Sequence, residues 1–149
     1  MEQSLVLIKP DGVQRGLIGK IITRFEDRGL RLIGAKFLLV SEELAKKHYA
    51  VHEGKHFYDS LITFITSSPV MAMVWEGPDA ISAIRQTVGK TRGTEAAPGT
   101  IRHDYGIQAQ FNLVHASDSV ENGQAEIALW FKPEELVHWK RITEDWMFE

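Results

Sequence analysis

The stretch LVLIKPDGVQRGLIGKIITRFEDRGLRLIGAKF, residues 5–37, contains the pattern that decides the fold. Its first four residues are apolar and stop before the sequence PDG at 10–12, which predicts a short buried strand and then a turn. Apolar side chains recur at i, i+3, i+4 and i+7 over residues 18–25, which predicts an amphipathic helix that ends at Gly29. The apolar run at 30–40 predicts a second strand, so a strand–helix–strand unit is expected.

The rest of the chain repeats this alternation. We expect strands at 70–75 and 109–114, helices between and after them, and Ser41 and Asp79 as helix N-caps. Residues 89–108 have little periodicity, and a structureless segment of this length in a compact domain is usually functional. Two halves of this kind predict either a split-βαβ, ferredoxin-like α+β sandwich or a parallel doubly wound sheet. The pattern alone fits both architectures.

The composition is typical of one globular domain, with 149 residues and a net charge of −3. A chain of this length buries about 70% of its unfolded surface, so it needs no disulfide or structural metal, and one domain is expected over 1–149. The lack of cysteine excludes a thiol nucleophile and cysteine-based zinc sites. The charge predicts no specific nucleic-acid partner. No apolar run is long enough for a signal peptide or a membrane span, so a cytoplasmic protein is expected.

The stretch NLVHASDS, residues 112–119, places His115 after an apolar run and follows it with small residues. By default such a histidine is structural. Neutral imidazole, with a reference pKa of about 6.5, is nevertheless a competent nucleophile when another group fixes its tautomer. Glu126, on the helix expected next, is a candidate for that group. Ser117 and Ser119 can cap this helix, whose positive end would then face a phosphate.

Several cations are available for an anionic ligand even though the net charge is negative. The planar fork of arginine binds phosphate oxygens in pairs, and such charges near a nucleophile would favour phosphoryl transfer. A solvated basic surface explains the same residues equally well. The cations in question are Lys9, Arg85, Lys90, Arg92 and Arg102.

The segment HEGKH, residues 52–56, offers a competing interpretation because it matches the H-E-x-x-H pattern of zinc hydrolases. That pattern requires a continuous helix with both histidines on one face and Glu53 as the general base. Gly54 at its centre disfavours such a helix, so a polar connector between two helices is the better interpretation. The common phosphate-binding glycine motifs are absent from the sequence, and Phe57 offers a ring on which a base could stack.

Taken together, these segments resemble the nucleoside diphosphate kinase family. NLVHASDS resembles the active-site signature of that family, and residues 5–37 resemble its N-terminal segment. The sequences HYAVHEGKHFY, PVMAMVWEG, PGTIR and EIALWF recur in matching order, so the resemblance covers essentially the whole chain. It implies a ferredoxin-like βαββαβ sandwich, in which helices cover a four-stranded antiparallel sheet.

The resemblance also implies an activity and its site. Members of the family transfer the γ-phosphate of a nucleoside triphosphate such as ATP to a nucleoside diphosphate, by a ping-pong route with Mg²⁺ (Mg2+) and low base specificity. Mg²⁺ would be carried by the nucleotide phosphates, so no protein metal ligand is expected. The implied catalytic residues are His115 as the phosphorylated nucleophile, Glu126, Ser117, Lys9 and Tyr49. The implied nucleotide-binding residues are Lys9, Phe57, Leu61, Arg85, Thr91, Arg102 and Asn112.

Five residues differ from the usual family pattern. Ala116 stands where glycine is usual, which would be strained if its φ were positive. Gln110-Phe111 replaces Gly-Arg, Gly93 replaces a proline, and His56 replaces another proline. The alternative function is therefore a catalytically weakened relative that binds nucleotide or a partner. The C-terminal sequence ITEDWMFE resembles that of hexameric members, so a homohexamer is expected, with a tetramer as the alternative.

Overall fold

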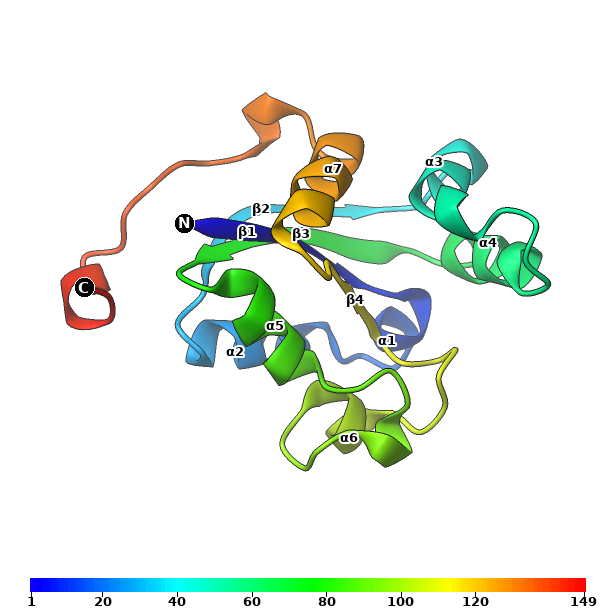
Figure 1. Ribbon diagram of the computed structural model, residues 1–149, viewed down its shortest axis with the longest axis horizontal. Helices are drawn as coiled ribbons and strands as arrows, with labels where there is room; N and C mark the ends of the chain where they lie inside the picture. Colours follow the sequence, from blue (N-terminus) through cyan, green and yellow to red (C-terminus); the bar gives the residue numbers. More distant parts are fainter.

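The computed structural model describes residues 1–149 as one four-stranded sheet with helices on both faces (Figure 1). The strand order is β2-β3-β1-β4, and every neighbouring pair is antiparallel. This pairing confirms the ferredoxin-like α+β sandwich and excludes the parallel doubly wound sheet. The strands are β1 (Glu2–Ile8), β2 (Arg31–Leu38), β3 (Val70–Gly77) and β4 (Val114–Ala116).

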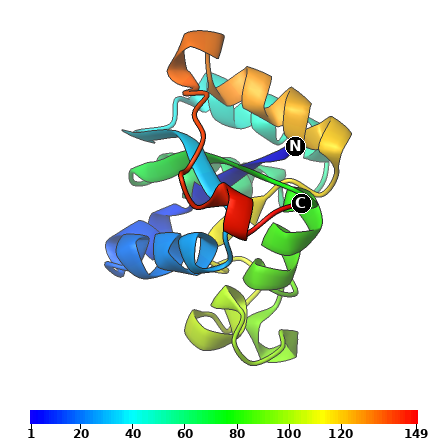
Figure 2. The same cartoon turned by 90° about the vertical axis from the view of Figure 1, so that its left-hand side faces the viewer.

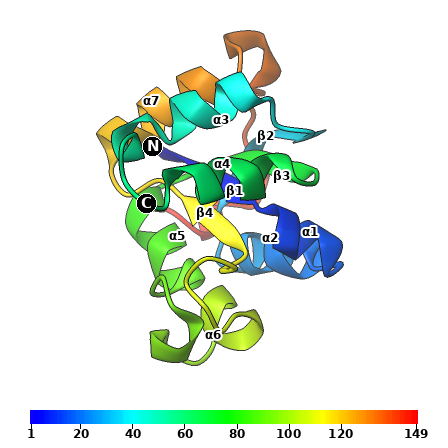
Figure 3. The same ribbon diagram turned by 90° about the vertical axis from the view of Figure 1, so that its right-hand side faces the viewer.

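Two groups of helices cover the sheet (Figures 2 and 3). One face carries α2 (Ile18–Asp27) and α5 (Ala80–Val88). The other carries α3 (Glu42–His48), α4 (Tyr58–Thr66) and α7 (Val120–Trp130). The short helices are α1 (Pro10–Gln14), α6 (Ile101–Tyr105) and four 3-10 turns, η1 (Ala50–His52), η2 (Gly93–Glu95), η3 (Pro133–Glu135) and η4 (Glu144–Trp146). No helix combines the length and apolar character that a membrane crossing requires.

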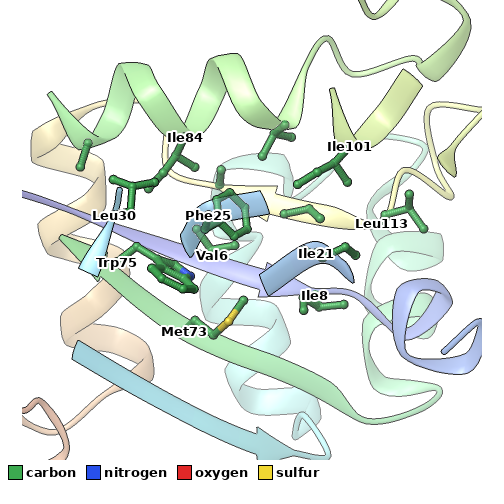
Figure 4. Close-up of a cluster of buried hydrophobic side chains, with 14 of the residues drawn as sticks. Val6, Ile8, Ile21, Phe25, Leu30, Met73, Trp75, Ile84, Ile101 and Leu113 are labelled. Atoms are coloured by element: carbon green, nitrogen blue, oxygen red, sulfur yellow. The ribbon is translucent and has the colours of Figure 1, made fainter. Parts of the chain in front are cut away.

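Strand β1 explains why the sandwich has two cores. Its side chains alternate between the faces of the sheet, so Val6 and Ile8 pack under α2 and α5, in the cluster shown in Figure 4. Leu5 and Leu7 pack under the helices on the opposite face. All four side chains are fully buried. A strand buried on both faces reads as a continuous apolar run, which is the pattern seen in the sequence.

Most predicted elements are confirmed at the positions where periodicity was strong. Helix α2 covers the 18–25 pattern, and the Ser41 hydroxyl accepts a hydrogen bond from the Leu44 amide at 3.1 Å as the N-cap of α3. Strand β2 changes register between Leu32 and Gly34, as a β-bulge.

Three local predictions are wrong. The expected turn at 10–12 is the start of α1, because proline suits the first turn of a helix as well as a turn. The strand expected at 109–114 begins only at Val114, as the short strand β4, because Leu113 just before it takes a positive φ of 75°. Asp79 makes no side-chain cap for α5; instead the Glu2 carboxylate accepts a hydrogen bond from the Ile81 amide at 3.1 Å.

Candidate active site

Three elements meet at a cleft of about 570 Å³. The end of α3 supplies His48 and Tyr49, strand β4 supplies His115, and α7 supplies Glu126. Arg85 of α5 also lines the cleft. The sheet brings β4 next to β1, and α7 packs back over β1, so residues distant in sequence share one site.

The imidazole of His115 is held by one carboxylate oxygen. Its Nε2 lies 3.1 Å from Glu126 Oε1, and Ser117 Oγ donates to the same oxygen at 2.6 Å. The Leu5 amide donates to Ser117 Oγ at 3.0 Å, which ties the group to β1. Because Nε2 faces Glu126, Nδ1 is the ring nitrogen left for chemistry. This is the nucleophile-and-orienter arrangement that covalent catalysis requires.

Glu126 remains ionised in this setting. Burial alone would raise the pKa of its carboxyl, but the hydrogen bonds from His115 and Ser117 and the nearby histidines outweigh burial and lower the pKa overall. An ionised Glu126 accepts the Nε2–H of His115, which fixes the tautomer with Nδ1 unprotonated.

Two predicted cations are buried beside this group. Lys9 is 9% exposed, and burial, followed by the charge of Arg102, lowers its pKa to about 8. Arg102 is 6% exposed, and burial, followed by the charge of Arg85, lowers its pKa to about 10. The Arg102 guanidinium donates to the carbonyl oxygens of Asn112, Gly89 and Val114.

Of the other predicted residues, some line the cleft and others lie outside it. Tyr49 lines the cleft, and burial raises the pKa of its phenol to about 12, so the hydroxyl keeps its proton. Asn112 is buried and donates from Nδ2 to the Thr91 carbonyl at 3.1 Å. The rings of Phe57 and His52 pack edge to face, with centroids 5.2 Å apart. Seven predicted residues do not line the cleft that contains His115: Lys9, Phe57, Leu61, Thr91, Arg102, Asn112 and Ser117.

The zinc-hydrolase interpretation is wrong. Residues 52–56 form no helix: η1 ends at His52, and Gly54 has a φ of 85°. The residues whose ligand atoms converge are instead His48, His115 and Glu126, within 4.8 Å of one another. Lys90 and Arg92 of the expected cation group are exposed and do not line the cleft.

Sequence reasoning missed three residues that line the cleft. His48 lies four residues before His52 of the zinc pattern, and nothing in its spacing points to His115. Asp118 and Asn122 follow β4 and pair with each other at 2.6 Å. Their position just after His115 was the available signal for these two.

Three of the residues that differ from the usual family pattern fit their local surroundings. Ala116 does not have a positive φ, so its methyl group causes no backbone strain. Gly93 lies so close to Gly106 that an added Cβ would come within 2.1 Å of the Gly106 carbonyl oxygen. The Phe111 ring packs edge to face on Phe64, with centroids 5.2 Å apart.

Comparison with known proteins gives a consistent result. Residues 2–136 match the family model described as nucleoside diphosphate kinase. The nucleoside diphosphate kinase of Roseiflexus sp. is 55% identical over 149 residues, the full length of both chains. The relative from Staphylococcus epidermidis is 54% identical, also over the full length of both.

Solved structures agree with the sequence matches. The nucleoside diphosphate kinase of Halobacterium salinarum, solved in complex with CDP, is 53% identical and superposes with a TM-score of 0.96 over 99% of each chain. A nucleoside diphosphate kinase family protein from Babesia bovis is 49% identical, with a TM-score of 0.97 over 99% of this chain and 100% of its own. The chain described here therefore belongs to the nucleoside diphosphate kinase family.

Proposed function

We propose that this protein transfers the γ-phosphate of a nucleoside triphosphate to a nucleoside diphosphate by a ping-pong route, through a phosphohistidine on His115. The observation that carries the proposal is the contact of His115 Nε2 with Glu126 Oε1 at 3.1 Å, which leaves Nδ1 as the free nitrogen. Family membership supports the reaction class.

In the first half-reaction, the lone pair on His115 Nδ1 attacks the γ-phosphorus. A nitrogen–phosphorus bond forms, the bond from the γ-phosphorus to the bridging oxygen breaks, and the diphosphate leaves with that electron pair. Glu126 keeps the Nε2–H hydrogen bond and offsets the positive charge that develops on the ring. The second half-reaction reverses these steps with a different diphosphate, so one site serves both substrates.

The remaining roles follow the family resemblance. Lys9 and the Tyr49 hydroxyl would contact the γ-phosphate, and the fixed charge of Arg102 would act with Arg85 on the β- and γ-phosphates. The CDP complex of the Halobacterium relative supports nucleotide binding. Stacking on Phe57 would read only the face of the base, which accounts for low base specificity. Thr91 would also hold the phosphates, Asn112 would bond the ribose, and Leu61 would lie near the base.

Mg²⁺ is the cofactor in this proposal, carried mainly by the phosphate oxygens. The cleft fits such a cation because Asp118 lines it and is bound only to Asn122, whereas Glu126 is engaged with His115. When bound, Mg²⁺ neutralises charge on the transferring phosphates.

Initial-rate kinetics test the proposal directly. Varying ATP at several fixed concentrations of GDP should give parallel double-reciprocal lines, because the first product leaves before the second substrate binds. Intersecting lines would contradict the ping-pong route. The alternative, a weakened relative, predicts a phosphoenzyme that GDP discharges very slowly in a single turnover.

The proposal extends to the whole protein. One domain over residues 1–149 would carry the activity, in the cytoplasm and as a homohexamer. Exposed apolar residues of the C-terminal segment support self-association, since Ile142 is 96% exposed and Trp146 is 90% exposed.

A further inference from the structure

His48 lies directly against the proposed nucleophile. The ring centroids of His48 and His115 are 4.6 Å apart, and their planes meet at 80°. His48 is the last residue of α3, so one helix end places its ring over β4. Neither the family resemblance nor the mechanism above uses this side chain.

Trp130 determines which nitrogen of His48 carries the proton. The indole Nε1 of Trp130, a buried residue of α7, lies 3.1 Å from His48 Nδ1. An indole nitrogen can only donate, so His48 Nδ1 must accept. The neutral ring therefore carries its proton on Nε2. The Trp130 ring also packs edge to face on His48, with centroids 5.4 Å apart, so the imidazole is fixed in both orientation and tautomer.

This tautomer distinguishes between two uses of the cluster. The ligand atoms of His48, His115 and Glu126 lie within 4.8 Å of one another, which is compatible with a metal ion. A histidine that ligates through Nε2 needs a lone pair there, and His48 has a proton instead. The bond from Trp130 occupies the other nitrogen. The arrangement suits a fixed neutral ring beside the nucleophile and not a metal ligand.

We propose that His48 is a positioning residue for the proposed phosphotransfer: pinned by Trp130, its ring packs edge-on against His115 and holds the nucleophile with Nδ1 available. The inference rests on the proposed function, since it concerns the orientation of the same nucleophile. Glu126 then restrains the imidazole of His115 at Nε2, and His48 restrains it through ring packing.

The charge state of His48 fits this role. Burial, followed by the charge of His115, lowers the pKa of His48 to about 3, so the ring is neutral at every pH where the reaction is expected to run. A second cation against His115 would oppose the positive charge that develops there during attack. The titratable groups that act on His48 from neighbouring elements are His115, Glu126, Lys9 and His52.

The test uses three variants of the full chain: Trp130→Phe, His48→Phe and the double variant. Trp130→Phe removes the donor and keeps a ring. His48→Phe keeps a ring but leaves the indole N–H buried without an acceptor, and the double variant removes that defect. Trp139→Phe, on the C-terminal segment, is the matched control. It also deletes one indole hydrogen bond, which Trp139 donates to the Leu32 carbonyl at 2.9 Å.

The measurement is the single-turnover rate of phosphoenzyme formation from ATP, as a function of ATP concentration and pH. We expect His48→Phe and the double variant to lose about 10- to 100-fold in the limiting rate, the range expected when a reacting group is misplaced, with half-saturation within about twofold. The losses of limiting rate in His48→Phe and Trp130→Phe should not add in the double variant, because His48 and Trp130 act as one unit. Trp139→Phe should match the parent.

The split between the limiting rate and half-saturation separates positioning from a purely structural role. In Trp130→Phe, burial and the charge of His115 still keep His48 neutral, so the acid limb should keep its parental pH while the limiting rate falls. In the double variant the acid limb should likewise keep its parental shape at a lower plateau.

Parental limiting rates in His48→Phe and the double variant would overturn the inference, as would a limiting rate in Trp130→Phe identical to that of the parent. If the parent itself formed no phosphoenzyme, the proposed function would fail instead, and the two failures are therefore distinguishable.

Discussion

At the scale of single residues, Glu126 Oε1 is the atom that orients His115, the proposed nucleophile. It lies 3.1 Å from His115 Nε2 and accepts from Ser117 Oγ at 2.6 Å. Neither contact follows from sequence spacing, because the residues lie on a strand, the segment after it and a helix. The sequence could name the residue types, whereas only the packing of α7 on β1 places the carboxylate.

We predict that Glu126→Gln lowers the rate of phosphoenzyme formation by about 100-fold, within the range that a positioned charged group contributes. The amide keeps the shape but loses the negative charge that stabilises the imidazole as it becomes positive. Stopped-flow or quenched-flow kinetics check this value. The control is Glu121→Gln, an exposed carboxylate at the start of the same helix, which should leave the rate unchanged.

Lys9 gives a prediction about pH. Its pKa in the folded protein is about 8, below the usual lysine value of 10.5, mainly because of burial. The ammonium loses its proton as pH rises through about 8, so kcat/KM for the triphosphate should fall above that pH. A kcat/KM that is flat to pH 10 would contradict the assigned contact with phosphate.

The same lowered pKa has a consequence for stability. Between pH 8 and 10.5 the unfolded state binds more protons at Lys9 than the folded state, so stability contributed by this group rises with pH across that window. Lys9→Met should therefore raise the free energy of unfolding at pH 7 by about 1–3 kcal/mol while impairing catalysis. Urea titrations at pH 7 and 10 measure the free energy of unfolding and its dependence on pH. Lys20→Met, at an exposed position of α2, is the control.

At the scale of elements, periodic segments were predictable and irregular ones were not. Helix α2 and strand β1 follow from apolar spacing, because each buries the faces that the pattern marks. The start of strand β4 was predicted too early in the sequence. The positive φ of Leu113, which delays the strand, is set by tertiary contacts, including the Lys9 amide donating to the Leu113 carbonyl at 2.8 Å. No local propensity encodes a contact across more than 100 residues of sequence.

The 89–113 segment supplies an element-scale prediction. An added Cβ at Gly93 would meet backbone atoms of Gly106 and Arg102 at 2.1–2.5 Å, so Gly93→Ala must shift the segment that holds Arg102. We expect a loss of about 2 kcal/mol or more in unfolding free energy, together with weaker nucleotide binding. Gly19→Ala is the matched control: it is in open space on α2 and should stabilise by about 0.5–1 kcal/mol. Equal stability of the two variants would contradict the packing argument.

At the scale of the whole molecule, alternation of strands and helices left two architectures open. Strand direction decides between them, and direction depends on how loops return the chain, which single-residue patterns do not report. The family resemblance resolved this point before the pairing was known. It also named the residues of the site, but it gave no role to His48, whose relation to His115 emerges only from ring geometry.

The C-terminal segment leads to a prediction about assembly. It runs from α7 past the sheet and ends in a short turn, η4, at the left of Figure 1. The Arg141 guanidinium donates to the Leu30 and Gly29 carbonyls at 3.1 and 2.7 Å, which fixes the segment on its own chain. Ile142 and Trp146 nevertheless face solvent. Replacing both with serine should dissociate the proposed homohexamer into smaller species, measured by sedimentation velocity, and an unchanged mass would contradict their role in assembly.

The most direct test of the central claim is to follow the phosphate itself. The protein is mixed with Mg²⁺ and γ-labelled ATP, separated from free nucleotide, and then chased with GDP, with His115→Ala treated in parallel. We predict an acid-labile, base-stable label on the parent chain only, which leaves as labelled GTP. No label on a parent chain that demonstrably binds nucleotide, or equal labelling of His115→Ala, would contradict the assignment of His115 as the nucleophile.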